Sequence, residues 1–138
     1  MNRYVIYNAT YHILICQCGY AIPQDWILRH FRQLHKAIPL TIRSEIIEHG
    51  KSQNLWQPRD VKAVWETNAH KSPVQGLTVS PGFECLYDGC IKLTRTEPSM
   101  KQHVRKIHGW FKKDGIMWKN QAMQTFFEAQ NRKYVLIV

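Results

Sequence analysis

Two cysteines and two histidines in the second half of the sequence have the order and spacing of a metal site. Cys85, Cys90, His103 and His108 follow the pattern C-x4-C-x12-H-x4-H, which falls within the spacing of Cys2His2 zinc fingers. Two thiolates on a short hairpin supply half of a tetrahedron, and two imidazoles about a turn and a quarter apart on a helix supply the other half. The alternative is a chance arrangement or a disulfide, but four ligand types in this order form a specific signal. We therefore predict that these side chains bind zinc.

A similar set of four residues lies nearer the N-terminus. Cys16, Cys18, His30 and His35 follow the pattern C-x1-C-x11-H-x4-H. In an extended strand, residues i and i+2 point to the same side, so both sulfurs reach one metal only if the chain bends locally. The alternative is that the histidines lie on a helix surface and the thiols are buried as small hydrophobic groups. We predict a second zinc ion at this set, and hence two zinc ions in the chain.

The residues around the later set predict the elements that would position it. Residues 87–89, Tyr-Asp-Gly, are turn formers between the two cysteines. Residues 97–99, Glu-Pro-Ser, suit the start of a helix, and Gly109 follows His108 where a helix commonly ends. A hairpin followed by a helix is therefore expected here.

The residues around the first set predict two strands and a helix. Short strands are expected at residues 4–7 and 11–15, and a helix is expected from residues 23–25 to about residue 35 or 36. Apolar residues at helical spacing, which we expect to be buried, are Ile27, Phe31 and Leu34.

The rest of the chain reads as helices, a linker and a terminal strand. A helix capped by Thr41 is expected to end at residues 49–50, and a short helix is expected at residues 59–67. Residues 68–81 are polar and contain Pro and Gly, so they read as a linker or as an irregular strap across the surface. Residues 133–138 look like a strand.

These elements predict an α+β fold: a small zinc-stabilised domain with two ββα-like Cys2His2 finger units joined by a helical segment. We expect residues 1–138 to form a single domain. Its parts are a first finger-like unit at 11–36, a helical connector at 37–81, a second finger at 82–110 and a C-terminal packing segment at 111–138.

Charge indicates the class of partner. The 138 residues include 19 Lys and Arg against 10 Asp and Glu, which gives a net charge of +9. Such an excess favours a polyanionic partner, most simply nucleic acid. No apolar run reaches the length of a membrane span, and the N-terminal apolar run is too short for a signal peptide. The cysteines are therefore expected in a reducing compartment.

The basic residues are better placed for phosphates than for bases. The finger positions that would face base edges in the second unit, Thr96, Ser99 and Gln102, are polar but are not the arginines that read guanine. The gap between the two units is also too long for a tandem array. The alternative for the basic residues is that they form solvated helix faces. Those predicted to contact phosphate are Arg29, Arg32, Lys36, Arg43, Lys101, Arg105, Lys106, Lys112 and Lys113.

No residue pattern predicts an enzyme. Each Cys2His2 set would be filled by four protein ligands, which leaves no position for a reactive water. HExxH, P-loop, GxSxG and GxGxxG motifs are missing from the sequence. Because His12, His49 and His70 remain unassigned, a metal-dependent nuclease is kept as a third hypothesis.

Several motifs resemble a known family. They occur at residues 14–23, 28–35, 73–77, 82–85, 99–110 and 124–127. Together they resemble the fungal orsellinic acid biosynthesis cluster protein D family, although that family has two residues between its first cysteines and this chain has one. The resemblance implies two Cys2His2-type zinc units in one domain, which occurs alone or attached to larger fungal proteins, including helicase-like ones.

The leading hypothesis is a nuclear, non-enzymatic zinc module that binds nucleic acid, DNA before RNA, mainly through phosphate contacts. The alternative is a zinc-scaffolded protein–protein interaction domain whose basic face meets an acidic partner.

Overall fold

The computed structural model describes residues 3–64, 72–127 and 134–137. The chain divides into two compact units, and each contains one of the predicted metal sets. Unit 1 comprises residues 1–67, 75–78 and 125–133, and unit 2 comprises residues 68–74, 79–124 and 134–138. The single domain over residues 1–138 and its internal boundaries stay predictions. Parts of the predicted short helix, linker and terminal strand lie outside the described residues, at residues 65–69 and 133. His70 also lies outside them.

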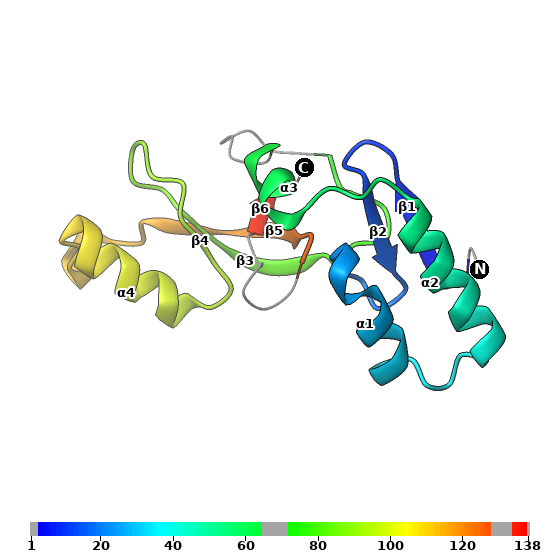
Figure 1. Ribbon diagram of the computed structural model, residues 1–138. Coiled ribbons are helices and arrows are strands. Elements are labelled where there is room, and N and C mark those ends of the chain that lie inside the picture. The colour runs from blue at the N-terminus through cyan, green and yellow to red at the C-terminus, as the bar shows by residue number, and fades with distance from the viewer. Residues whose placement is uncertain (1–2, 65–71, 128–133, 138) are drawn as a thin grey trace. The chain divides into compact units, whose positions relative to one another are not determined.

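Unit 1 begins with a two-stranded hairpin. Strands β1 (Val5–Asn8) and β2 (Ile13–Cys16) pair antiparallel, with Val5 opposite Cys16 (Figure 1). The Asn8 side chain accepts a hydrogen bond from the backbone N–H of Tyr11 at 2.9 Å, which closes the turn. The two predicted strands are thus present, each shifted by one or two residues. All four residues of β2 are buried, so this strand lies in the interior of unit 1.

The helix predicted after this hairpin is shorter than expected. A 3₁₀ turn, η1 (Gln24–Trp26), leads into α1 (Ile27–Gln33). Ile27 and Phe31 are buried as predicted, but the burial predicted for Leu34 is wrong, because its side chain is 67% exposed. Leu34 lies beyond the last helical residue, so the helical periodicity no longer directs it to the core.

Two further helices complete the helical part of unit 1. Helix α2 (Leu40–Ser52) begins before Thr41 and runs past residues 49–50, so the predicted Thr41 cap and helix end are both wrong. Pro39 occupies the cap position, and its fixed φ suits the entry to a helix. Helix α3 (Pro58–Val64) begins one residue before the short helix predicted at residues 59–67 and overlaps it.

The core of unit 1 forms where α1 and α2 pack against the hairpin. A methyl group in place of the Gly50 hydrogen would lie 2.6 Å from the Ile27 side chain, so this glycine lets the two helices approach closely. The buried residues of this core are Val5, Leu14, Cys16, Ile22, Ile27, Phe31, Ile38, Ile46, Ile47 and Leu55.

Unit 2 is built on a four-stranded sheet with the order β4-β3-β5-β6. The strands are β3 (Ser80–Cys85), β4 (Leu93–Thr94), β5 (Trp118–Thr125) and β6 (Tyr134–Leu136). β3 pairs antiparallel with β4 and with β5, and Cys85 lies opposite Trp118. Helix α4 (Glu97–His108) lies beside the β3–β4 pair (Figure 1).

The helix of unit 2 has the predicted ends. Thr96 caps its N-terminus by accepting a hydrogen bond from the Ser99 N–H, and Pro98 lies in its first turn. Gly109 follows with a φ of 63°, the left-handed conformation of a common helix end. Its buried face packs Met100 and Val104 into a core that also contains Cys85, Trp110 and Trp118.

The segment after α4 returns the chain to the sheet. At the start of the predicted C-terminal packing segment lies a 3₁₀ turn, η2 (Lys112–Asp114). The Asp114 carboxylate accepts a hydrogen bond from the Phe111 N–H at 2.8 Å, and the Trp110 indole donates to the Gly115 carbonyl at 2.7 Å. These bonds hold the loop at the end of α4.

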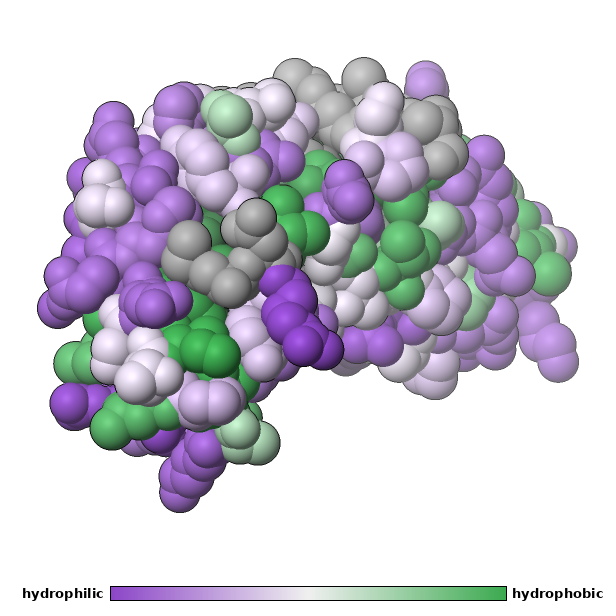
Figure 2. Space-filling model, turned by 90° about the vertical axis from the view of Figure 1, so that its right-hand side faces the viewer, coloured by the Kyte–Doolittle hydropathy of each residue, from purple (hydrophilic) through white to green (hydrophobic). Residues whose placement is uncertain are grey.

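The fold class is confirmed as a small α+β structure with two Cys2His2-type groups. Among the described residues, no helix has the length and apolar character needed to cross a membrane. Hydrophilic side chains cover most of the face in view in Figure 2, with hydrophobic side chains in separate patches.

Candidate metal centres

The group in unit 2 is assembled by a hairpin and a helix. Cys85 is the last residue of β3, Cys90 lies in the loop before β4, and His103 and His108 lie on α4. The loop turns at Gly89, which has a φ of 77°, and the Cys90 N–H donates to the Tyr87 carbonyl at 3.0 Å. This is the turn that the sequence predicted between the cysteines.

The four ligand atoms of this group face one another. The Cys85 sulfur lies 3.6 Å from Nε2 of His108, and the Cys90 sulfur lies 3.3 Å from Nε2 of His103. The Tyr87 ring stacks on His108 with centroids 4.1 Å apart, which holds that imidazole in place. We call these four residues the unit 2 group.

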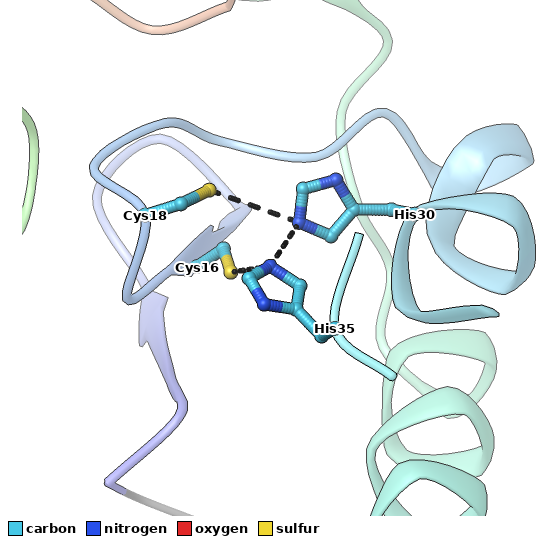
Figure 3. Close-up of side chains that lie close together, drawn as sticks. All are labelled: Cys16, Cys18, His30 and His35. Atoms are coloured by element: carbon cyan, nitrogen blue, oxygen red, sulfur yellow. Dashed lines mark hydrogen bonds between the residues drawn. The ribbon is translucent and has the colours of Figure 1, made fainter. Parts of the chain in front are cut away.

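The group in unit 1 depends on a sharp bend after β2. The Gly19 N–H donates to the Cys16 carbonyl at 2.9 Å, and Gly19 has a φ of 97°. This turn lets the Cys16 and Cys18 sulfurs approach the same pair of imidazoles despite the single residue between them (Figure 3). The local bend that the short spacer demands is therefore present.

The two histidines of unit 1 reach the cysteines from different local structures. His30 lies on α1, but His35 lies after the helix end, so the prediction of a helix through residue 35 is wrong. The Cys16 sulfur lies 3.2 Å from Nε2 of His35, and the Cys18 sulfur lies 3.8 Å from Nε2 of His30. The two Nε2 atoms are 3.1 Å apart (Figure 3). We call these four residues the unit 1 group.

The spacing of the ligand atoms fits a single tetrahedral ion in each group. With Zn–S bonds of about 2.3 Å and Zn–N bonds of about 2.0 Å, tetrahedral ligand atoms lie roughly 3.3–3.8 Å apart. The sulfur–nitrogen distances in unit 2, 3.6 and 3.3 Å, lie in this range. In unit 1 they are 3.2 and 3.8 Å and the two Nε2 atoms are 3.1 Å apart, so two of these distances are slightly shorter than the range. All four cysteines lie in the described part of the chain and are free, and the ligand atoms of each group lie within 4.8 Å of one another. Both groups can therefore hold a metal ion.

The protonation of the ligand atoms is also suited to a cation. In the unit 1 group, the side-chain hydrogen bond between the two thiols lowers the pKa of Cys18 to about 3 and raises that of Cys16. In the unit 2 group, burial raises the pKa of Cys85, and burial lowers the pKa of His103. A neutral His103 can donate its lone pair directly, whereas Cys85 releases a proton when a metal binds.

The predicted phosphate contacts of unit 1 are mostly exposed. Arg29 and Arg32 lie on α1 and Lys36 follows it, and all three are exposed. Arg43 differs, because it is half-buried on α2 and its Nε donates to the Ile38 carbonyl at 2.9 Å. It is therefore partly engaged in joining α2 to the preceding turn.

Some of the predicted phosphate contacts of unit 2 also have partners. Lys101 forms an ion pair with Glu97 at 3.5 Å, and the Arg105 guanidinium lies 5.8 Å from the Trp110 ring centroid. Lys106, Lys112 and Lys113 are exposed. The structure adds Lys92 and Arg95, which flank β4 and line a groove beside α4 with Lys106. Sequence reasoning missed these two because their proximity to the helix depends on strand pairing.

The described histidines outside the two groups have other neighbours. His12 stacks on Trp56 with centroids 4.8 Å apart and lies 3.1 Å from the Tyr7 hydroxyl. His49, on α2, lies 3.5 Å from the side-chain amide of Gln53, the residue that follows this helix. Within the described residues, neither belongs to a cluster of three or more metal-ligating side chains.

Comparison with known proteins gives the family. Residues 3–109 match the family described as "Orsellinic acid/F9775 biosynthesis cluster protein D". The chain is 30% identical over 129 residues to a protein of that name from Emericella nidulans, and this alignment covers 93% of the chain and 24% of the relative. The chain thus spans about a quarter of that relative's length. No solved structure matches it. The match over most of the chain confirms that this protein belongs to the orsellinic acid/F9775 biosynthesis cluster protein D family.

Proposed function

We propose that both groups bind zinc and that the folded chain is a non-enzymatic module which binds nucleic acid, DNA before RNA, mainly through phosphates. The observation that carries the proposal is the placement of exposed cations beside both groups. A DNA partner implies a nuclear location. The large share of the relative that lies outside the alignment leaves room for this module to serve a longer protein.

Zinc is favoured by the chemistry of the ligands. Two thiolates and two imidazoles at tetrahedral spacing suit a borderline-soft ion with no preferred d-electron geometry. Four protein ligands fill its coordination, so its role is structural and no water is activated. This closed coordination supports a binding module over the metal-dependent nuclease.

Phosphate binding is supported by an excess of cations that carboxylates do not neutralise. Residues 79–124 contain four acidic residues against twice as many basic ones. Of the acids, Glu97 pairs with Lys101, and Asp114 accepts the Phe111 N–H. Glu84 accepts the Gln121 amide at 2.9 Å and pairs with Lys119 at 3.9 Å, so two of the cations have a carboxylate partner. The surplus charge is therefore free to attract a polyanion.

The proposal is tested by metal analysis and by binding at several salt concentrations. Mass spectrometry of the purified chain should give two zinc ions per molecule. Fluorescence anisotropy with a labelled duplex should show an affinity that falls linearly on a log–log plot between about 50 and 200 mM salt. No binding to DNA or RNA at the lowest salt would remove the nucleic-acid proposal, and intact plasmid with Mg²⁺ or Mn²⁺ would dismiss the nuclease.

The second candidate is an acidic protein partner, and a groove between α1 and α2 favours it. The groove has a volume of about 190 Å³ and is lined by the apolar residues Leu28, Leu40 and Ile47. Its charged residues are three cations, Arg32, Arg43 and Lys51, and one acid, Glu48, which pairs with Lys51 at 3.7 Å. Leu28 and Leu40 are 40% and 69% exposed. An apolar floor with basic neighbours suits an acidic amphipathic helix.

A pair of substitutions separates the two candidates. Leu28→Asp with Leu40→Asp removes apolar surface and adds negative charge at the α1–α2 groove. If the groove serves a protein partner, this variant should lose binding to a synthetic acidic amphipathic helix and keep at least part of the binding to DNA. If neither the parent nor the variant binds the peptide, the second candidate is excluded.

A further inference from the structure

A groove of about 630 Å³ in unit 2 runs between α4 and the β4 strand. On the helix side it is lined by Ser99, Gln102 and Lys106, whose spacings of three and four residues place them on one helix face. On the strand side it is lined by Lys92 and Arg95, the residues before and after β4. Residues distant in sequence thus bring three cations to one concave surface.

The charges on this surface are positive and come from Lys92, Arg95 and Lys106. No acidic residue lines the groove among the described residues. Lys92, Arg95 and Lys106 are exposed, and none of them forms an ion pair with a described carboxylate. Like charges gathered without a counterion repel one another, so a bound anion would lower the electrostatic energy of the groove.

The other side chains of the groove also suit a phosphodiester chain. Ser99 and Gln102 are exposed polar side chains that can donate to phosphate oxygens, and the half-buried Tyr134 adds an aromatic side chain to the lining. Thr96 and Ser99, two of the positions that face bases in DNA-reading fingers, bond each other at 2.8 Å while they cap the helix. This arrangement favours backbone contacts over base reading.

We propose that this groove is the phosphate-binding surface of unit 2, in which Lys92, Arg95 and Lys106 contact the backbone of a nucleic acid. The inference rests on the proposed function and names the surface that performs it. The inference also replaces two residues that the sequence predicted to contact phosphate, because Lys101 is paired with Glu97 and Arg105 lies over the Trp110 ring. Two of the three groove cations, Lys92 and Arg95, were not predicted from the sequence.

The test compares two triple variants of the full chain with equal loss of charge. The groove variant carries Lys92→Gln, Arg95→Gln and Lys106→Gln. The control carries Arg59→Gln, Lys62→Gln and Lys119→Gln, which lie on α3 and β5 and do not line the groove. Binding to a labelled duplex and to one of its strands is measured by anisotropy from about 50 to 200 mM salt.

The groove variant should bind roughly 10- to 100-fold more weakly, and its salt slope should fall by two to three, about one for each lost phosphate contact. The control should lose less than about threefold. Equal weakening of both variants, or no weakening of the groove variant, overturns the groove while the proposed function stands. A parent chain that binds neither probe removes the proposed function itself.

A measurement without substitutions covers the case in which the groove variant does not fold. Backbone amide shifts of the zinc-loaded parent chain are followed by NMR as the DNA strand is added. Shifts should concentrate at β4 and at Ser99, Gln102 and Lys106 on α4. Shifts that leave these residues unchanged while others move would show that nucleic acid binds elsewhere and would overturn the inference.

Discussion

At the scale of single residues, the two groups account for every cysteine and for four of the seven histidines. His108 shows how one ligand is fixed, because Tyr87 stacks on its ring and Nε2 points at the Cys85 sulfur 3.6 Å away. His49 is also half-buried and also on a helix, but its described partner is the Gln53 amide. The two histidines therefore form a matched pair, of which only His108 belongs to a candidate metal-ligand group.

We expect His108→Ala to lower the zinc content from two ions per chain to one and to leave the unit 1 group loaded. The remaining three ligands would bind the ion far more weakly, and the loss of a structural zinc would destabilise unit 2 by at least ~2 kcal/mol. Zinc content and urea unfolding measure the two effects. His49→Ala is the control and should keep both ions. Two tightly bound ions in the His108 variant would contradict the assignment of this ligand.

At the scale of elements, α4 has ends that can be tested separately from the metal. Gly109 has a φ of 63°, and a side chain added there would meet no atom within 4 Å. Its substitution therefore changes only the backbone energy. Gly109→Ala should lower the free energy of unfolding by about 1 kcal/mol. Gly109→Asn should recover much of this loss, since Asn tolerates the left-handed conformation. Urea denaturation at constant zinc would measure both, and equal stability of Ala and Asn variants would argue against a conformational cause.

The elements also show what the sequence could predict and what it could not. The hairpin and helix of unit 2 were predictable because their signals are local: a turn between Cys85 and Cys90, helix-start residues at 97–99 and a glycine at 109. The end of α1 was not, because the apolar spacing continues through Leu34 while His35 turns back to Cys16 at 3.2 Å. Tertiary contact overrode periodicity at that point.

The start of α2 and the basic groove were missed for related reasons. Thr41 is a good cap residue, but Pro39 already supplies the entry geometry of α2, so the helix begins before Thr41. Lys92 and Arg95 have no helical pattern to mark them, and they line one surface with Lys106 only because β4 pairs with β3 beside α4. The metal ligands could be predicted from residue types and spacing along the sequence. The residues that line the groove could not, because they come together only in the folded chain.

At the scale of the whole molecule, the two units differ in the apolar cores that surround their metal-ligand groups. Unit 1 has a broad apolar core of strand and helix residues, with Phe31, Leu14 and Ile46 fully buried. Among the described residues, the core of unit 2 has fewer buried apolar side chains, and the cluster at its metal-ligand group includes Cys85 itself, packed with Met100, Val104, Trp110 and Trp118. Loss of the ion from the unit 2 group should therefore loosen a core that has fewer apolar side chains to hold it.

Tryptophan fluorescence can report this difference, because Trp110 and Trp118 are buried in unit 2, whereas in unit 1 Trp26 is 43% exposed and Trp56 is half-buried. Trp65 lies outside the described residues. We expect His103→Ala, in the unit 2 group, to move the emission maximum to longer wavelength as these two indoles meet water. His30→Ala, in the unit 1 group, should lose one zinc ion with a smaller shift, since the unit 1 core retains its buried aliphatic residues. Chelation of both ions from the parent chain should reproduce at least the shift of the His103 variant. A larger shift in the His30 variant would mean that unit 1 depends more on its metal than its larger core predicts.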